Sequence, residues 1–199
     1  MKNLQYPLDF KFKITTLASD FTITDRTGQM LAYVRQKIFK IKDNVQVFDN
    51  EDKTRVLYTI QANKWIDFNA SFAITDPNTN TEIGKIARKG MRSFWKATYN
   101  ILDNRGENLF TVTEENPWIK FWDSLVGELP IIGMFTGYFL NPTYVVKDQN
   151  GQAIFKLKKM PSFFGRRFQL DRLVDIPDDQ ETLCALSLMM MILLERARG

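Results

Sequence analysis

The fold is decided by the stretch Leu183-Cys184-Ala185-Leu186-Ser187-Leu188-Met189-Met190-Met191-Ile192-Leu193-Leu194, in which Ser187 is the only polar side chain. A helix at a protein surface has an apolar stripe, whereas a helix that is apolar on every side must be enclosed by protein or by lipid. At about 1.5 Å of rise per residue the stretch spans roughly 18 Å, which is short of the roughly 30 Å of a bilayer core. We therefore predict a helix over about residues 179–197 that is enclosed by the chain's own fold.

The residues that flank this stretch fit the two ends of a helix. Asp178 follows Pro177 and is the predicted N-cap, and Glu181 three residues later has the spacing of a capping box. Acidic residues at the start and Arg196 and Arg198 at the end both complement the helix dipole. An apolar centre with charged ends suits a helix whose ends emerge at the two openings of a barrel.

Upstream, three stretches share the pattern aromatic, x, β-branched, x, Asp-x-x-Gly, x-x, aliphatic. They are Phe21–Leu31, Tyr99–Leu109 and Tyr144–Ile154, with looser copies that begin near Phe72 and Val47. The alternation before Asp predicts a half-buried strand, Asp can bond its own backbone, and Gly tolerates the positive φ of a return turn. The turns lack the further acidic ligands and the distal Glu of an EF-hand, so we interpret them as hairpin turns and not as calcium loops.

Other alternating runs lie between these hairpins and raise the count to roughly a dozen strands of about five to six residues each. Consecutive hairpins make the sheet antiparallel, and closure of the sheet removes its exposed edges. The predicted fold is mainly β: a closed antiparallel β-barrel of about twelve strands around the hydrophobic C-terminal α-helix, as a single domain over residues 1–199.

Residues 114–142 depart from the hairpin pattern. Trp118, Phe121 and Trp122 stand at helical spacing, and an apolar stretch with two glycines follows at residues 130–140. We predict a short helical insertion here, for which two interpretations stay open. It is either a plug over one mouth of the barrel, or an element at a membrane surface or partner, with these three aromatic residues as the candidate contacts.

Composition restricts the function. The chain has no histidine, which excludes histidine triads, histidine general bases and imidazole metal sites. Its one cysteine, Cys184, cannot form an internal disulfide and lies within the apolar helix. The sequence has no Gly-rich phosphate loop, no nucleophile elbow and no metal-ligand cluster, so we expect neither an enzyme nor a metal or cofactor. Residues 1–12 lack the apolar core of a secretory signal, which predicts a cytoplasmic location.

The three hairpins, the Ile83–Ile86 strand with the basic segment that follows it to Lys96, and the Leu183–Leu194 helix resemble the tubby C-terminal-like superfamily, most closely its LURP-one-related and phospholipid scramblase branch. The resemblance covers nearly the whole chain outside residues 114–142. It implies a twelve-stranded antiparallel barrel closed around the C-terminal helix. Scramblases carry a cysteine cluster and an acidic calcium-binding segment, and this sequence has neither, so the resemblance does not imply scramblase activity.

Tubby proteins bind phosphoinositides through Lys and Arg on the barrel, and the resemblance therefore implies a non-catalytic barrel that binds anionic lipid headgroups or another anionic ligand, peripheral to a membrane. The nearest residues by type are Lys85, Arg88, Lys89, Arg92 and Lys96. A second basic group comprises Lys156, Lys158, Lys159, Arg166 and Arg167. Each basic residue near an anionic surface gains about 1 kcal/mol. Alternating lysines are equally what the outer face of a barrel should show.

Two other functions compete with this hypothesis. One is a protein-interaction scaffold that uses the aromatic residues of the insertion. The other is nucleic-acid binding, in which Phe94 and Trp95 would stack on bases beside Arg92 and Lys96. A net charge of +4 is low for a nucleic-acid partner, and no RRM, KH or helix-turn-helix signature is present, so nucleic acid is the least favoured partner.

Overall fold

The computed structural model describes residues 3–13, 18–37, 44–63, 71–88, 98–115, 142–161 and 167–196, and the structural statements below concern these residues. They form twelve strands and one helix. The strands are β1 (Leu8–Lys13), β2 (Ala18–Thr24), β3 (Met30–Lys37), β4 (Val45–Phe48), β5 (Val56–Asn63), β6 (Ser71–Asp76), β7 (Thr81–Arg88), β8 (Thr98–Leu102), β9 (Asn108–Glu114), β10 (Thr143–Lys147), β11 (Ala153–Met160) and β12 (Arg167–Arg172), and the helix is α3 (Asp178–Arg196).

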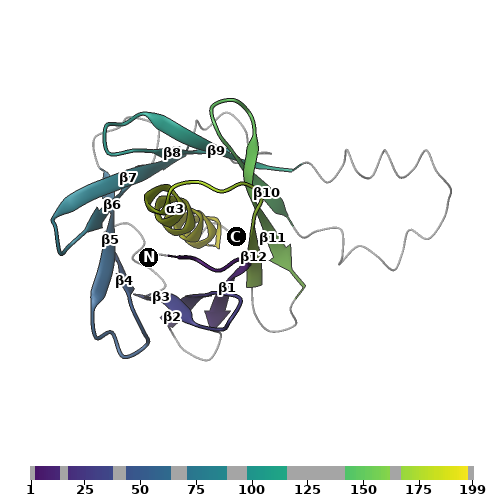
Figure 1. Ribbon diagram of the computed structural model, residues 1–199. Helices are drawn as coiled ribbons and strands as arrows, with labels where there is room; N and C mark the ends of the chain where they lie inside the picture. Colours follow the sequence, from purple (N-terminus) through teal and green to yellow (C-terminus); the bar gives the residue numbers. More distant parts are fainter. Residues whose placement is uncertain are drawn as a thin grey trace.

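Each strand pairs antiparallel with its neighbour in the sequence, and β1 pairs with β12 to close the barrel. The closing seam runs from Leu8 opposite Leu170 to Lys11 opposite Arg167. Figure 1 looks into the barrel and shows α3 surrounded by the ring of strands. The predicted fold is thus confirmed, and the helix lies within one residue of its predicted bounds.

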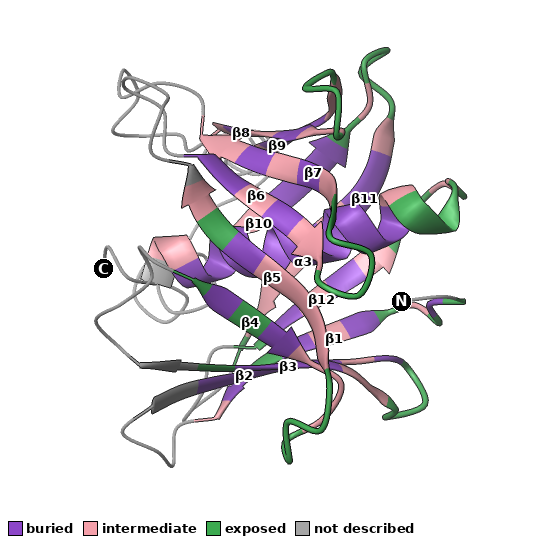
Figure 2. Cartoon of the chain, turned by 90° about the vertical axis from the view of Figure 1, so that its left-hand side faces the viewer, coloured by how far each residue is buried: buried purple, intermediate pink, exposed green. Residues whose placement is uncertain are grey.

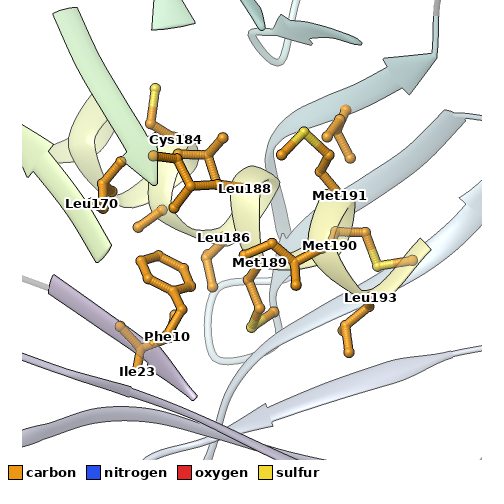
Figure 3. Close-up of a cluster of buried hydrophobic side chains, with 14 of the residues drawn as sticks. Phe10, Ile23, Leu170, Cys184, Leu186, Leu188, Met189, Met190, Met191 and Leu193 are labelled. Atoms are coloured by element: carbon orange, nitrogen blue, oxygen red, sulfur yellow. The ribbon is translucent and has the colours of Figure 1, made fainter. Parts of the chain in front are cut away.

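The barrel interior is filled by side chains from the strands and from every side of α3. Residues 183–193 of the helix are all buried, and strand residues such as Phe10, Ile23 and Leu170 point toward them (Figure 3). Complete burial of one such side chain contributes about 1.5–3 kcal/mol, so the helix makes a large contribution to core stability. Ser187 is also fully buried, and its hydroxyl has no hydrogen-bond partner among the described residues.

The three Asp-x-x-Gly turns adopt one geometry. In each, the Asp Oδ1 accepts hydrogen bonds from the backbone N–H groups two and four residues later, with N–O distances of 2.8–3.0 Å. The Gly N–H donates to the Asp carbonyl at 3.0–3.1 Å. The three glycines, Gly28, Gly106 and Gly151, have φ of +82° to +85°, a conformation that other residues rarely adopt. The turn prediction is confirmed.

Strand direction sorts the connections between two ends of the barrel. These three turns, the β6–β7 turn and the start of α3 lie at one end, which we name the turn end (Figure 2). The last turn of α3 lies at the opposite end, the loop end, where β7 and β9 finish and β8 and β10 begin. Strand direction would also place the β4–β5 turn at the turn end, but its Glu51 forms an ion pair with Lys13, the last residue of β1. We therefore count this turn with neither end.

The segment that the sequence predicts to be an insertion joins β9, which ends at Glu114, to β10, which begins at Thr143. The short helix predicted within it, with Trp118, Phe121 and Trp122, lies outside the described residues. No helix in the part of the chain that the structure describes is both long enough and apolar enough to cross a membrane.

The predicted capping box is wrong. The first backbone hydrogen bond of α3 runs from the Glu181 N–H to the Pro177 carbonyl at 2.9 Å. The Glu181 carboxylate does not fold back onto the helix start, and instead accepts a hydrogen bond from Arg172 Nη1 at 2.6 Å. The physical reason is burial. Glu181 is only 2% exposed, and burying its carboxylate without a cation would cost more free energy than leaving the helix end uncapped.

Candidate functional site

Two of the five predicted lipid-binding residues are described, and they occupy different faces of β7. Lys85 lies between the buried residues Gly84 and Ile86 and therefore points out of the barrel, where its Nζ is 3.1 Å from Glu82. Arg88 is directly opposite Tyr99, whose side chain is inside the barrel. Directly paired positions share a face, so Arg88 stands at an inward position at the loop end.

The other predicted contacts, Lys89, Arg92 and Lys96, lie outside the described residues, as do Trp118, Phe121 and Trp122. The assignment of these residues to a binding site stays a prediction. The structure does show which strands these two segments connect. One joins β7 to β8 and the other joins β9 to β10, both at the loop end.

The second basic group is largely neutralised on the outer face of the sheet. Nζ of Lys156 is 3.1 Å from the Glu115 carboxylate, and Nζ of Lys158 is 2.8 Å from Asp171. Arg167 contacts Asp9 with two hydrogen bonds, at 3.0 and 2.6 Å, across the β1–β12 seam. Arg166 lies outside the described residues. These pairs favour the interpretation of this group as an ordinary outer barrel surface.

The ion pairs also act on the ionisation of their members. Partial burial raises the pKa of Asp171, but hydrogen bonds from Lys158 and Gln169 outweigh it and hold that pKa below its usual value. The hydrogen bond to Asp9 raises the pKa of Arg167. The Asp171 carboxylate and the Arg167 guanidinium therefore stay charged at neutral pH, each beside a partner of opposite charge.

A small hollow of about 100 Å³ lies beside the last turns of α3. Its lining residues are Phe12, Pro142, Tyr144, Lys159, Phe168, Met191, Ile192 and Glu195. Burial raises the pKa of the Tyr144 phenol, so it stays neutral. With one lysine and one glutamate in a mainly apolar wall, this hollow is too small and too balanced in charge to select an anionic headgroup.

A larger hollow of about 730 Å³ lies at the turn end, beside the start of α3. It is lined by Tyr58, Thr81, Glu82, Ile83, Asp103, Asn104, Arg105, Leu109, Asp178, Asp179, Gln180, Thr182 and Leu183. Four of these residues are acidic and one is basic. We name it the turn-end hollow. No sequence pattern indicates this hollow, because its residues come from four separate parts of the chain.

The buried Glu181 carboxylate near the turn end is held by a structural ion pair. Arg172, which bonds Glu181, also lies over the ring of Tyr6, with 4.9 Å from its Cζ to the ring centroid. Burial raises the pKa of the Cys184 thiol, with Glu181 adding to the effect, so the thiol stays protonated. Among the described residues, no group of three or more His, Cys, Asp or Glu is placed to hold a metal ion.

The chain has similarities to known proteins, both to a family and to a solved structure. Residues 30–127, about half of the chain, match the family described as LURP-one-related. The X-ray structure of a protein from Arabidopsis thaliana is similar with a TM-score of 0.48 and 11% sequence identity, over 95% of this chain and 93% of that chain. No curated protein matches. The chain, a twelve-stranded barrel closed around its C-terminal helix, belongs to the LURP-one-related family.

Proposed function

We propose that this chain is a non-catalytic β-barrel module that binds anionic lipid headgroups at a membrane surface through its loop end. The observation that carries the proposal is a difference in composition between the two ends of the barrel. The turn-end segments 25–29, 76–81, 103–107, 148–152 and 173–179 contain eight acidic and two basic residues. The segments that join strands at the loop end, 14–17, 38–44, 64–70, 89–97, 115–142 and 161–166, contain eight basic and five acidic residues.

Tryptophan follows the same division. The chain has four tryptophans, Trp65, Trp95, Trp118 and Trp122, and all four belong to loop-end segments. Trp is enriched where proteins meet the headgroup region, because its ring is apolar and its N–H can bond to water or lipid. Basic and aromatic residues together are the composition of an element that lies on a membrane surface.

The charge difference also predicts an orientation. An anionic membrane attracts nearby basic residues by about 1 kcal/mol each and repels acidic ones. The loop end would therefore face the lipid, with the turn end directed away. Neither hollow beside α3 is basic, which supports headgroup contact at the barrel surface over an anionic ligand held inside the barrel.

Intrinsic tryptophan fluorescence tests the proposal, because the signal comes only from loop-end segments. We expect a blue shift on addition of phosphatidylcholine–phosphatidylserine vesicles, quenching by brominated acyl chains, and little change with pure phosphatidylcholine. Binding should weaken as salt rises, since exposed charges are screened within about 10 Å at 0.1 M.

Replacement of Arg88, Lys89 and Arg92 together by Gln should weaken vesicle binding on the order of 100-fold, because each charge near an anionic surface contributes about 1 kcal/mol.

The matched control removes three positive charges elsewhere, with Arg26, Lys53 and Arg55 replaced by Gln. These residues are exposed and lie in the β2–β3 and β4–β5 turns. The control should bind vesicles nearly as well as the wild type. An equal loss of vesicle binding in the two triple variants would mean that only the overall charge of the chain matters. Equal binding to neutral and anionic vesicles would also contradict the proposal.

A further inference from the structure

The floor of the turn-end hollow is apolar. Tyr58 of β5, Ile83 of β7 and Leu109 of β9 are half-buried around the fully enclosed Leu183 of α3. Ile83 is only half-buried for a structural reason: Ile74 pairs with Gly84 and Thr75 with Glu82, so Ile83 is the extra residue of a β-bulge. At about 730 Å³ the hollow lies within the range of roughly 300–1,000 Å³ that is usual for ligand sites.

The rim above this floor is negative. Asp178 and Asp179, in the first turn of α3, are exposed and form no ion pair within the described part of the chain. Glu82 and Asp103 extend the rim, although Glu82 is paired with Lys85 at 3.1 Å and one oxygen of Asp103 is used in its turn. Arg105 is the one basic residue of the lining.

Charge complementarity identifies the occupant that this surface fits. A negative rim over an apolar floor matches a short peptide segment with one apolar side chain between Lys or Arg residues. We propose that the turn-end hollow binds such a basic segment of a partner protein, with the apolar side chain on Ile83 and Leu109 and the cations at Asp178 and Asp179. The site is independent of the lipid face at the other end of the barrel.

The test uses a fluorescein-labelled peptide, Lys-Arg-Leu-Arg-Lys, titrated with the full chain at low ionic strength and followed by anisotropy. A peptide with Gly in place of Leu carries the same charge and should bind several-fold more weakly, because it loses the apolar contact. The double variant Asp178→Asn with Asp179→Asn should bind the Leu peptide at least tenfold more weakly. Ile83→Ala should weaken binding of the Leu peptide but not of the Gly peptide.

The matched control is Asp52→Asn with Glu107→Gln, which removes two exposed acidic charges at residues outside the lining of the hollow, with Glu107 in the same turn as Asp103. Circular dichroism of each variant should match that of the wild type, which checks that the variant is folded. The same loss in both double variants, or equal affinity for the Leu and Gly peptides, would show general electrostatic attraction and overturn the proposal. Self-association in sedimentation that disappears in the Asp178/Asp179 variant would also overturn it, because the occupant would then be a second copy of the chain.

Discussion

Gly84 shows how closely the helix packs on the sheet. A Cβ placed on this residue would lie 2.4 Å from the Leu102 carbonyl oxygen and 2.7–2.8 Å from the methyl groups of Leu183. The carbonyl belongs to the backbone of the neighbouring strand β8 and cannot rotate away. Glycine at this position therefore permits the contact between β7 and the first turns of α3 that fixes the depth of the helix in the barrel.

We expect Gly84→Ala to lower the free energy of unfolding by about 1–3 kcal/mol, the usual cost of overpacking a core. Gly106→Ala is the control, because a Cβ there meets nothing within 4 Å and its cost, about 1–2 kcal/mol, comes from the positive φ alone. Urea unfolding measures both. A smaller loss at Gly84 than at Gly106 would mean that α3 is free to move away from β7.

At the scale of residues, the sequence predicted contacts whose partners are close in the chain. The Asp25, Asp103 and Asp148 turns were predictable because each carboxylate bonds only to atoms within four residues of it. The role of Glu181 was not, because its partner Arg172 is on β12 and the aromatic ring beneath Arg172 is near the start of the chain. A local capping rule had no access to that arrangement.

At the scale of elements, the start of α3 is tied to two other parts of the barrel. Arg172 at the end of β12 bonds Glu181 at 2.6 Å, and its guanidinium covers Tyr6. Tyr6 in turn stacks on Phe155 of β11, with ring centroids 5.7 Å apart. The network joins the N-terminal segment, the sheet and the helix, so it sets the helix against the turn end of the barrel.

Arg172→Met should lower the free energy of unfolding by about 3 kcal/mol, because it leaves the charge of Glu181 buried without a cation. Arg167→Met on the same strand removes an exposed pair with Asp9 and should cost less than about 1 kcal/mol. Adding Glu181→Leu to Arg172→Met should recover much of the loss. Equal losses for the two arginines in urea unfolding would contradict the structural role of the network.

The strands were predictable from periodicity, since the apolar pattern of each strand records which of its faces is buried, and the helix was predictable because it is apolar on every side. The position of the β4–β5 turn was not. The ion pair of its Glu51 joins this turn to Lys13 of β1, a strand that is not a neighbour of β4 or β5 in the barrel. Tyr33, at an outward position of β3 between the inward Ala32 and Val34, is nevertheless buried, and Glu51 is among the charges near it. No two-residue alternation predicts a buried residue on the outer face.

At the scale of the whole molecule, the net charge of +4 conceals two ends of opposite character. The sequence identifies the basic stretch from Lys85 to Lys96, but only the pairing of β7 with β8 places Lys85 outside and Arg88 at an inward position. The turn-end hollow likewise depends on topology, since it needs β5, β7, β9 and α3 to meet at one mouth. The sequence therefore shows which charged residues are present, but only the strand pairing of the closed barrel shows where they lie.

The two proposed surfaces should therefore operate independently. β7 runs from one end of the barrel to the other, and its eight residues span roughly 26 Å at about 3.3 Å each. This separation exceeds the screening length of about 8 Å at physiological salt, so charge at one end has little effect on a ligand at the other.

Because the two ends act independently, we expect chain bound to phosphatidylserine-containing vesicles to carry the Lys-Arg-Leu-Arg-Lys peptide with it when the vesicles float in a density gradient. The peptide affinity should match that of the free chain, and the Asp178→Asn, Asp179→Asn variant should float without peptide. Release of the peptide on vesicle binding would show that both ligands compete for one surface, and the division of the barrel into two working ends would then be wrong.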